Sequence, residues 1–296
     1  MVLHLFLLAQ VLPAQHFPPI DRPGEGVELA AVIAPVCPTR IDTIASALLK
    51  AEDAAEYAVR DSHESTASWL ALGCARAVLA AHGVLAHDGL LMMAGNSWSM
   101  GAERAFLKVL AKQPANARAA EALSALALHD EAPDEEAATA AAMVDAIDHG
   151  ARAAPIYRAC SELEKRLGRL DVVARCANDA LRAGLDSTWQ LIRLARTRFA
   201  AADTLGGVKD FLAAVGAAHD STAEQEVTWH LQWFLTPTER KAWDRVPQAR
   251  REDWVRNAVI ERDVRDGQPF GARLAEHFNR LEYVEKNFAL RVAGVL

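Results

Sequence analysis

Apolar positions in the middle of the chain recur at helical spacing and are interrupted by short turns. Residues 154–187 form one such unit, in which a helix leads through the turn sequence LGRLD into a second helix. Residues 188–221 repeat this plan. Gly168 and Ala202 occupy equivalent turn positions, 34 residues apart. A fixed period of this length predicts stacked helix pairs, because one pair alone cannot bury its apolar face.

Small side chains are expected where paired helices touch, since larger ones would push the helix axes apart. They are Ser161 and Ala180 in one unit, and Ala195, Gly207 and Ala214 in the next. An earlier unit carries Leu123, Leu126, Ala127, Met143 and Ala146 in matching places. Over residues 67–220 the chain resembles the tetratricopeptide repeat (TPR) family. The resemblance implies an all-α, right-handed α-solenoid whose concave face, lined by the first helix of each pair, binds a protein or peptide.

The composition of the chain changes from Trp229 onward, where aromatic and charged residues replace alanines. Thr236 and Glu239 form a capping box with proline at the first helical position, so a helix begins there. Trp243 and Trp254 are expected in the core of the helices that follow. Besides these, a resemblance to a known family rests on Arg262, Asp263, Glu276, His277, Arg280, Tyr283 and Phe288. The segment resembles the helical first part of the bacterial GWxTD domain, a family common in exported bacterial proteins.

This second resemblance has two departures. Val264 stands where the family usually has proline, and the sequence ends at Leu296 without the Gly-Trp-x-Thr-Asp motif. The expected organisation is a leader and extended segment over residues 1–38, TPR-like helical repeats over 39–220, and a helical GWxTD-like segment over 221–296.

Composition and charge narrow the class of protein. Hydrophobic residues make up 51% and charged residues 24%, which is typical of a globular chain. The net charge of -7 argues against nucleic acid as a partner, because phosphate binding needs a basic face. Residues 1–14 are apolar but too short to span a membrane. They suggest a signal peptide that lacks the basic start, which predicts a periplasmic or secreted protein; a buried N-terminal helix, and then a cytoplasmic protein, is the alternative.

Four cysteines form no metal-binding spacing, and their even number is compatible with two disulfides or with four buried thiols. Cys160 and Cys176 each lie eight residues from Gly168, on opposite sides of the turn. Residues equidistant from the turn of a helical hairpin lie at the same height. We therefore expect their Cα atoms to lie within about 7 Å, close enough for a disulfide in an oxidising compartment.

Catalytic patterns are only near misses, and no cofactor is expected. Gly95–Ser99 is one glycine short of a nucleophile elbow. His82, His87 and Asp88 would share a metal only across a loop, since positions i and i+5 lie on different faces of a helix. The neighbours Glu276 and His277 point apart. The sequence favours a protein that is not an enzyme, although an active site completed by a partner stays open as an alternative.

The candidate binding site is a basic and aromatic groove on the first helices of two repeats. It comprises Arg158, Lys165 and Arg166, followed by Trp189 and Arg196. Cations in such a groove could clamp an acidic peptide or a C-terminal carboxylate. Alternatively, they only solvate a helix and pair with Glu162 and Glu164. The sequence thus predicts a protein-interaction scaffold; a structural subunit of a cell-envelope assembly is a further alternative.

Overall fold

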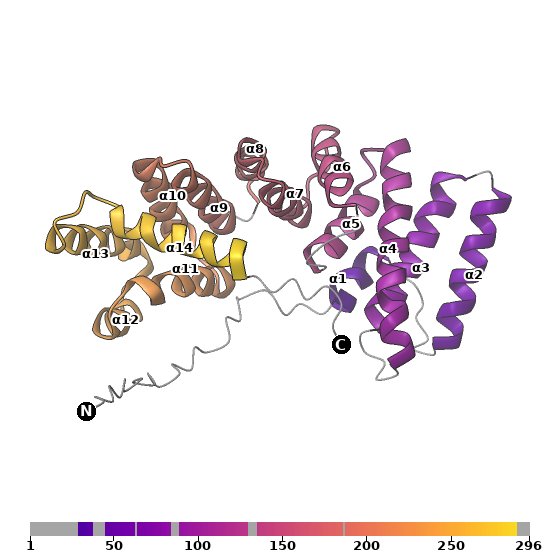
Figure 1. Cartoon of the computed structure of the whole chain (residues 1–296), viewed down its shortest axis with the longest axis horizontal. Coiled ribbons are helices and arrows are strands. Elements are labelled where there is room, and N and C mark those ends of the chain that lie inside the picture. Colours follow the sequence, from indigo (N-terminus) through magenta and orange to yellow (C-terminus); the bar gives the residue numbers. More distant parts are fainter. Residues whose placement is uncertain are drawn as a thin grey trace, which may run out of the picture.

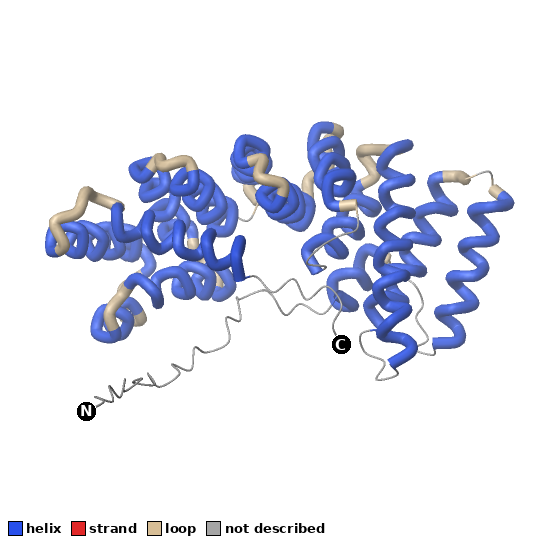
Figure 2. The backbone as a smooth tube through the Cα atoms, viewed as in Figure 1, coloured by secondary structure: helices blue, strands red, loops and turns tan. Residues whose placement is uncertain are grey.

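The computed structural model describes residues 29–37, 45–62, 64–83, 89–129, 135–185 and 187–288. Within these ranges every regular element is a helix (Figures 1 and 2). The proposed signal peptide, the loop residues His87 and Asp88, and the side chain of His82 lie outside what is described. The all-α fold predicted from the sequence is confirmed.

The helices follow one another along an arc that opens downward in Figure 1. They are α1 (Leu29–Val36), α2 (Ala45–Asp61), α3 (Thr66–Gly83), α4 (Gly89–Lys112), α5 (Ala117–His129), α6 (Glu136–Asp148), α7 (Ala154–Arg166), α8 (Leu170–Arg182), α9 (Ser187–Ala200), α10 (Thr204–Ala217), α11 (Ser221–Phe234), α12 (Pro237–Trp243), the short 3-10 helix η1 (Gln248–Arg250), α13 (Arg251–Arg265) and α14 (Ala272–Phe288). Consecutive helices α3/α4, α5/α6, α7/α8 and α9/α10 pack as pairs. This gives a solenoid-like stack.

The 34-residue period is visible in the turn geometry. Gly168, between α7 and α8, has φ +74°, and Ala202, between α9 and α10, has φ +60°. The amide of Gly168 donates to Lys165 O, and the amide of Ala202 donates to Phe199 O, one period later. In both turns the first helix of the pair therefore ends at a residue in the left-handed conformation, which is a common way for a helix to end. Alanine adopts this conformation less readily than glycine, so the local backbone alone does not favour it at residue 202.

Close packing explains a small residue inside a helix. A Cβ atom added to Gly207 on α10 would lie 2.6 Å from the ring of Phe199 on α9. Glycine at this position lets the two helices of the pair approach each other. The expectation that small residues lie between paired helices holds here, and Ser161, Ala180, Ala195 and Ala214 are also fully buried.

The buried apolar residues form two clusters rather than one. The first is built from α1–α8, and the second from α9–α14. This division of the buried residues lies between α8 and α9. The reason is that α9 and α10 pack against α14 and α13, so this helix pair shares its core with the C-terminal helices.

The C-terminal helices begin as the sequence predicts. Thr236 and Glu239 form the reciprocal hydrogen bonds of a capping box at the start of α12. Trp243 is buried in the second cluster, and its indole donates to Thr228 Oγ1 at 3.1 Å. Trp254 lies beside it, with ring centroids 5.8 Å apart, but is only partly buried. The expected core position is therefore confirmed for Trp243 and only partly for Trp254.

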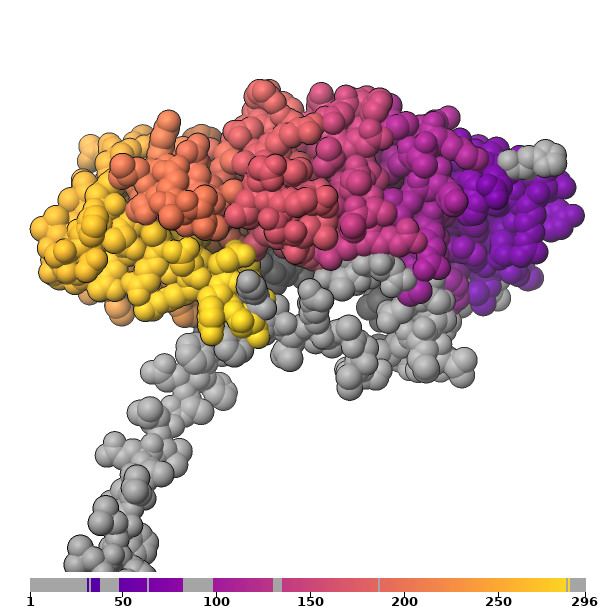
Figure 3. All heavy atoms as spheres, turned by 45° about the horizontal axis from the view of Figure 1, so that its top comes forward, coloured from indigo at the N-terminus to yellow at the C-terminus, as the bar shows by residue number. Residues whose placement is uncertain are grey.

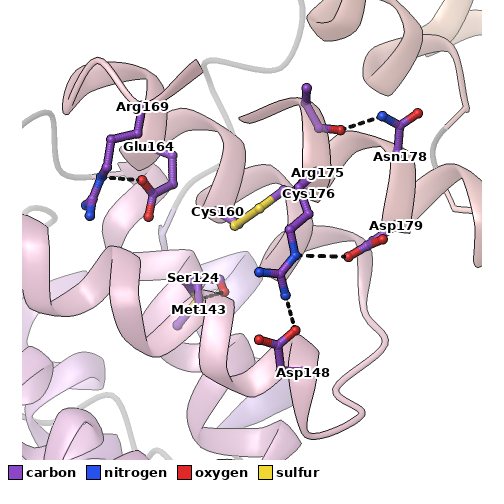
Figure 4. The surroundings of a disulfide bond; sticks show 11 residues. Ser124, Met143, Asp148, Cys160, Glu164, Arg169, Arg175, Cys176, Asn178 and Asp179 are labelled. Carbon is purple, nitrogen blue, oxygen red and sulfur yellow. Dashed lines mark hydrogen bonds and ion pairs between the residues drawn. A yellow bond between two sulfur atoms is a disulfide. The ribbon is translucent and has the colours of Figure 1, made fainter. Parts of the chain in front are cut away.

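All four cysteines are paired. Cys160 and Cys176 join α7 to α8 with their Cα atoms 6.3 Å apart, which agrees with the expected separation (Figure 4). Cys37 and Cys74 join the end of α1 to α3, with Cα atoms 5.2 Å apart. This second pairing was not predicted, because residues up to 38 were expected to be extended, whereas residues 29–36 form helix α1 and place Cys37 beside α3.

We expect no reactive thiol in denatured, unreduced protein. Replacing Cys160 and Cys176 together with alanine should lower the free energy of unfolding by about 3 kcal/mol, because a cross-link over a loop of this size limits the unfolded chain. Thiol titration with peptide mapping checks the pairing, and denaturant unfolding of the double variant against the oxidised chain checks the energy. Four titratable thiols in protein purified without reductant would contradict the pairing in solution.

Candidate functional site

The predicted groove residues lie on two neighbouring inner helices. Arg158, Lys165 and Arg166 are on α7, and Trp189 and Arg196 are on α9. The guanidinium of Arg158 lies 5.5 Å from the ring centroid of Trp189, across the gap between the two helices. The structure therefore brings together residues that are about 30 positions apart in the sequence, as the repeat pattern predicts.

A third helix covers this surface. Glu282 and Glu285, on the last turns of α14, both pair with Lys165 and with Arg196. The Glu282 carboxylate lies 3.3 Å from Lys165 Nζ and 3.2 Å from Arg196 Nη2. The side chains of Lys165 and Arg196 are consequently only 12% and 9% exposed. In Figure 3 the yellow atoms of α14 meet the surface of the middle helices.

The open groove expected from the sequence is thus corrected. Its two central cations bind carboxylates of the same chain, because α14 folds back over α9. The alternative pairing with neighbouring acidic residues holds only in part. Arg166 lies 3.9 Å from Glu162, but Glu164 is buried and pairs with Arg169 at 2.6 Å.

Four cations, Lys165, Arg166, Arg193 and Arg196, form what we call the basic cluster. Arg193 on α9 is buried; it pairs with Glu162 on α7 at 2.6 Å, and its guanidinium lies 4.6 Å from the Trp189 ring centroid. Its Nη1 atom is buried without a hydrogen-bond partner. A buried donor of this kind has lost its water without a full replacement.

Electrostatics in the cluster are strongly perturbed. Burial alone raises the pKa of Glu162, but the surrounding cations, Arg193 first among them, outweigh burial and lower the pKa to about 2. Burial lowers the pKa of Lys165 to about 7, and repulsion from Arg196 and Arg193 adds to this effect despite the nearby carboxylates. The carboxylates of Glu162 and Glu282 favour the ammonium form of Lys165 and oppose only part of this lowering of its pKa.

Contacts between aromatic rings hold α14 beside the basic cluster. Phe278 stacks on Phe199 with ring centroids 5.1 Å apart and meets Phe211 edge-on at 5.4 Å. His277 Nε2 lies 3.3 Å from His230 Nδ1 on α11. Burial, together with the positive charge that His230 and Arg196 can carry, lowers the pKa of His277 to about 3. The packing of α14 against α11 therefore requires a neutral His277.

The catalytic near misses gain no support from the geometry. Glu276 lies on the outer side of α14, where it pairs with Arg273 and Arg280, whereas His277 points inward to His230. Residues 95–99 lie within helix α4 and not in a turn after a strand. Within the described ranges, no three histidine, cysteine or acidic side chains gather as metal ligands, and no helix is long and apolar enough to cross a membrane.

The acidic half of the site was missed by the sequence reasoning. Glu282 and Glu285 are three residues apart, and both follow Phe278, on the same face of the helix. An acidic pair that extends an apolar stripe is the signal that could have identified α14 as a helix docked on cations. Hydrophobic spacing alone does not show which basic surface it would reach.

The chain was compared with known proteins. No family model matches it, and no curated protein or solved structure is significantly similar to it. A functional argument therefore depends on the site itself.

Proposed function

We propose that this chain is a protein-interaction scaffold that binds an acidic helix of its partner on α7 and α9. The observation that carries the proposal is the binding of Glu282 and Glu285 by Lys165 and Arg196. Helix α14 is then an internal occupant of the site, and the helix of the partner takes its place. Arg158, Arg166 and Trp189, which flank the pair, would extend the contact.

The spacing of the charges favours a helix as the partner. Two carboxylates three residues apart lie on one face of a helix, one turn from each other. They reach cations that belong to two separate helices, α7 and α9. An acidic side chain at each of these positions, with an aromatic residue four positions before the first, reproduces the contacts of α14.

Buried charge makes the site selective. A helix without acidic residues in the place of α14 would bury Lys165 and Arg196 without the carboxylates that now compensate them. Leaving a charge buried and unpaired costs several kcal/mol, about 3–5 for a fully buried pair. A partner that brings its own two carboxylates avoids this cost. A neutral helix does not, so the exchange should discriminate in favour of acidic helices.

The test uses a fluorescent peptide with the sequence of residues 272–288 and the full chain carrying Glu282→Gln and Glu285→Gln. We expect amide exchange in α14 of this variant to be at least about tenfold faster than in the wild type, because two buried cations lose their partners. The peptide should bind the variant at least about tenfold more tightly than the wild-type chain, where the site is filled. Fluorescence anisotropy measures the affinity.

The matched control is Glu276→Gln, which removes an exposed carboxylate of the same helix that pairs only along α14. It should change neither exchange nor peptide affinity. Adding Lys165→Ala and Arg196→Ala to the double glutamine variant should abolish peptide binding. Peptide binding that survives this change would show that the partner surface is elsewhere, and unchanged exchange in the glutamine variant would show that charge does not hold α14.

One observation favours a second candidate, a subunit of a larger assembly. An apolar depression runs along the outer face of α14, lined by Ala272, Ala275, Tyr283 and Val284 among others. The side chains of Tyr283 and Val284 are exposed there, and exposed apolar side chains that lie together are a feature of contacts between proteins. Sedimentation equilibrium of the purified chain tests the second candidate. An assembly subunit should self-associate through this face, or leave it free for a partner protein that the purified sample lacks.

We also propose that the chain is exported. The pairing of all four cysteines supports an oxidising compartment, where disulfides form and persist.

A further inference from the structure

The first helix lies on the inner side of the arc, as α14 does. Helix α1 packs on α3 and α5, the first helices of two successive pairs (Figure 1). Its Ile33 side chain is buried in the first apolar cluster, together with Cys37 just after the helix. The inner surface of these two repeats is therefore occupied by a short apolar segment, LAAVIAPV, from the N-terminal side of the chain.

Two polar features hold the end of α1. Arg118, in the first turn of α5, donates from Nε to the carbonyl oxygen of Val36 at 2.5 Å. This carbonyl belongs to the last turn of α1, where helix carbonyls have no partner within the helix. The Nη2 atom of Arg118 also lies 3.8 Å from the sulfur of Cys74. A cation at this end further complements the negative end of the helix dipole.

A covalent bond is part of the attachment of α1. An eight-residue helix with Pro35 inside it is too short to be stable alone, so its order depends on what it contacts. Besides the disulfide between Cys37 and Cys74, the described anchors are the buried side chain of Ile33, the partly buried side chain of Val36 and the hydrogen bond from Arg118. Closing a link between α1 and α3 raises the effective concentration of α1 at this surface.

We propose that the disulfide Cys37–Cys74 is a redox latch on a second binding site, and that reduction releases α1 and opens the α3/α5 surface to a short apolar helix of another protein. A dithiol reductant supplies two electrons and two protons, so that the two cysteines become thiols and the reductant becomes a disulfide. The incoming helix fills the place of Ile33 with an aliphatic side chain and presents its C-terminal carbonyls to Arg118.

This site is independent of the acidic-helix site on α7 and α9. The residues that carry it, Ile33, Cys37, Cys74 and Arg118, all belong to the first apolar cluster or touch it, whereas α14 belongs to the second. The two sites also differ in chemistry. The site on α3 and α5 accepts an apolar helix, whereas the site on α7 and α9 accepts an acidic one. Failure of either leaves the other standing.

The test measures binding of a capped fluorescent peptide with the sequence of residues 29–37, in which serine replaces cysteine. The full chain is compared in the oxidised form, after dithiothreitol, and as the Cys37→Ser variant without reductant. We expect the reduced chain and the variant to bind the peptide at least about tenfold more tightly than the oxidised chain, because the internal helix no longer fills the site. A peptide with aspartate in place of Ile33 should not bind any form.

Two controls separate the latch from general damage. The Cys160→Ala and Cys176→Ala double variant keeps only the Cys37–Cys74 bond, so its response to dithiothreitol reports on this bond alone. Circular dichroism melts follow the fold of each form. Equal peptide binding by the oxidised and reduced chains overturns the proposal. So does loss of the helical fold on reduction, because α1 would then be part of the structure and not a removable occupant.

Discussion

Replacing Phe278 with alanine is expected to lower the free energy of unfolding by about 3–5 kcal/mol. The side chain is 2% exposed and contacts three rings of the second cluster, those of Phe199, Phe211 and His230. The substitution removes the apolar contacts of this ring and leaves a cavity between α9, α10 and α14. Phe278 therefore determines whether α14 stays in place, and with it the cover over the basic cluster.

Denaturant unfolding followed by tryptophan fluorescence measures this effect. Five of the seven tryptophans, Trp189, Trp229, Trp233, Trp243 and Trp254, lie in helices α9–α14 and near the second cluster. The matched control is Tyr283→Ala on the same helix, where the side chain is 61% exposed. It should change the free energy by less than about 1 kcal/mol. Equal effects of the two substitutions would mean that α14 is not packed as described.

Acid should destabilise the second cluster, beginning near pH 6.5. The pKa of His277 falls from 6.5 to about 3 on folding, because burial and the neighbouring cationic groups disfavour its charged form. Between these values the unfolded chain binds a proton that the folded chain does not. Stability is therefore lost as the pH falls from 6.5 toward 3. The loss should be on the order of 2 kcal/mol by about pH 5, at roughly 1.4 kcal/mol per unit.

The surroundings of the ring show why protonation is costly. His230 on α11 already contacts His277 and lies 3.7 Å from Glu226, while Arg196 on α9 adds positive charge. Glu162 contributes separately at lower pH, because its pKa is lowered from 4.5 to about 2 and its stabilisation is lost only as the pH falls through that range. The two groups can therefore be distinguished by the pH at which stability declines.

The measurement is the free energy of unfolding of the wild type and of His277→Gln between pH 6.5 and 5, below most of the range in which Lys165, with its pKa of about 7, contributes to the slope. Glutamine keeps a donor and an acceptor but does not titrate, so the slope between pH 6.5 and 5 should be nearly lost. His219→Gln is the control, because His219 is exposed in the turn before α11. A slope that persists in the His277 variant would place the responsible proton elsewhere.

Local rules were enough to predict the helix pairs of residues 154–221 and their period, but not α1, which lies in the segment expected to be extended. Gly168 and Ala202 end their helices in the left-handed conformation because hydrogen bonds between near neighbours set each turn. The capping box of Thr236 and Glu239 is likewise local. The predicted spacing of Cys160 and Cys176 also followed from one hairpin, since the turn between them determines their height.

The candidate site was predicted in its basic half only. Repeat spacing places Arg158 near Trp189, and Lys165 near Arg196, because α7 and α9 occupy equivalent positions in successive units. The exposure of these cations did not follow from the same rule. It depends on α14, whose Glu285 lies 120 residues from Lys165 and 89 from Arg196 along the chain.

The sequence by itself determined that this chain is a stack of helix pairs, and which residues face inward within each pair. Only the tertiary structure decided what lies on the inner surface of the stack. Helix α1 covers α3 and α5, and α14 covers α9 and α11. Contacts within one hairpin are set by short-range geometry and by the apolar pattern. The docking of the two terminal helices joins segments far apart in the sequence, and it depends on complementary charge, a disulfide and ring packing that no local pattern specifies.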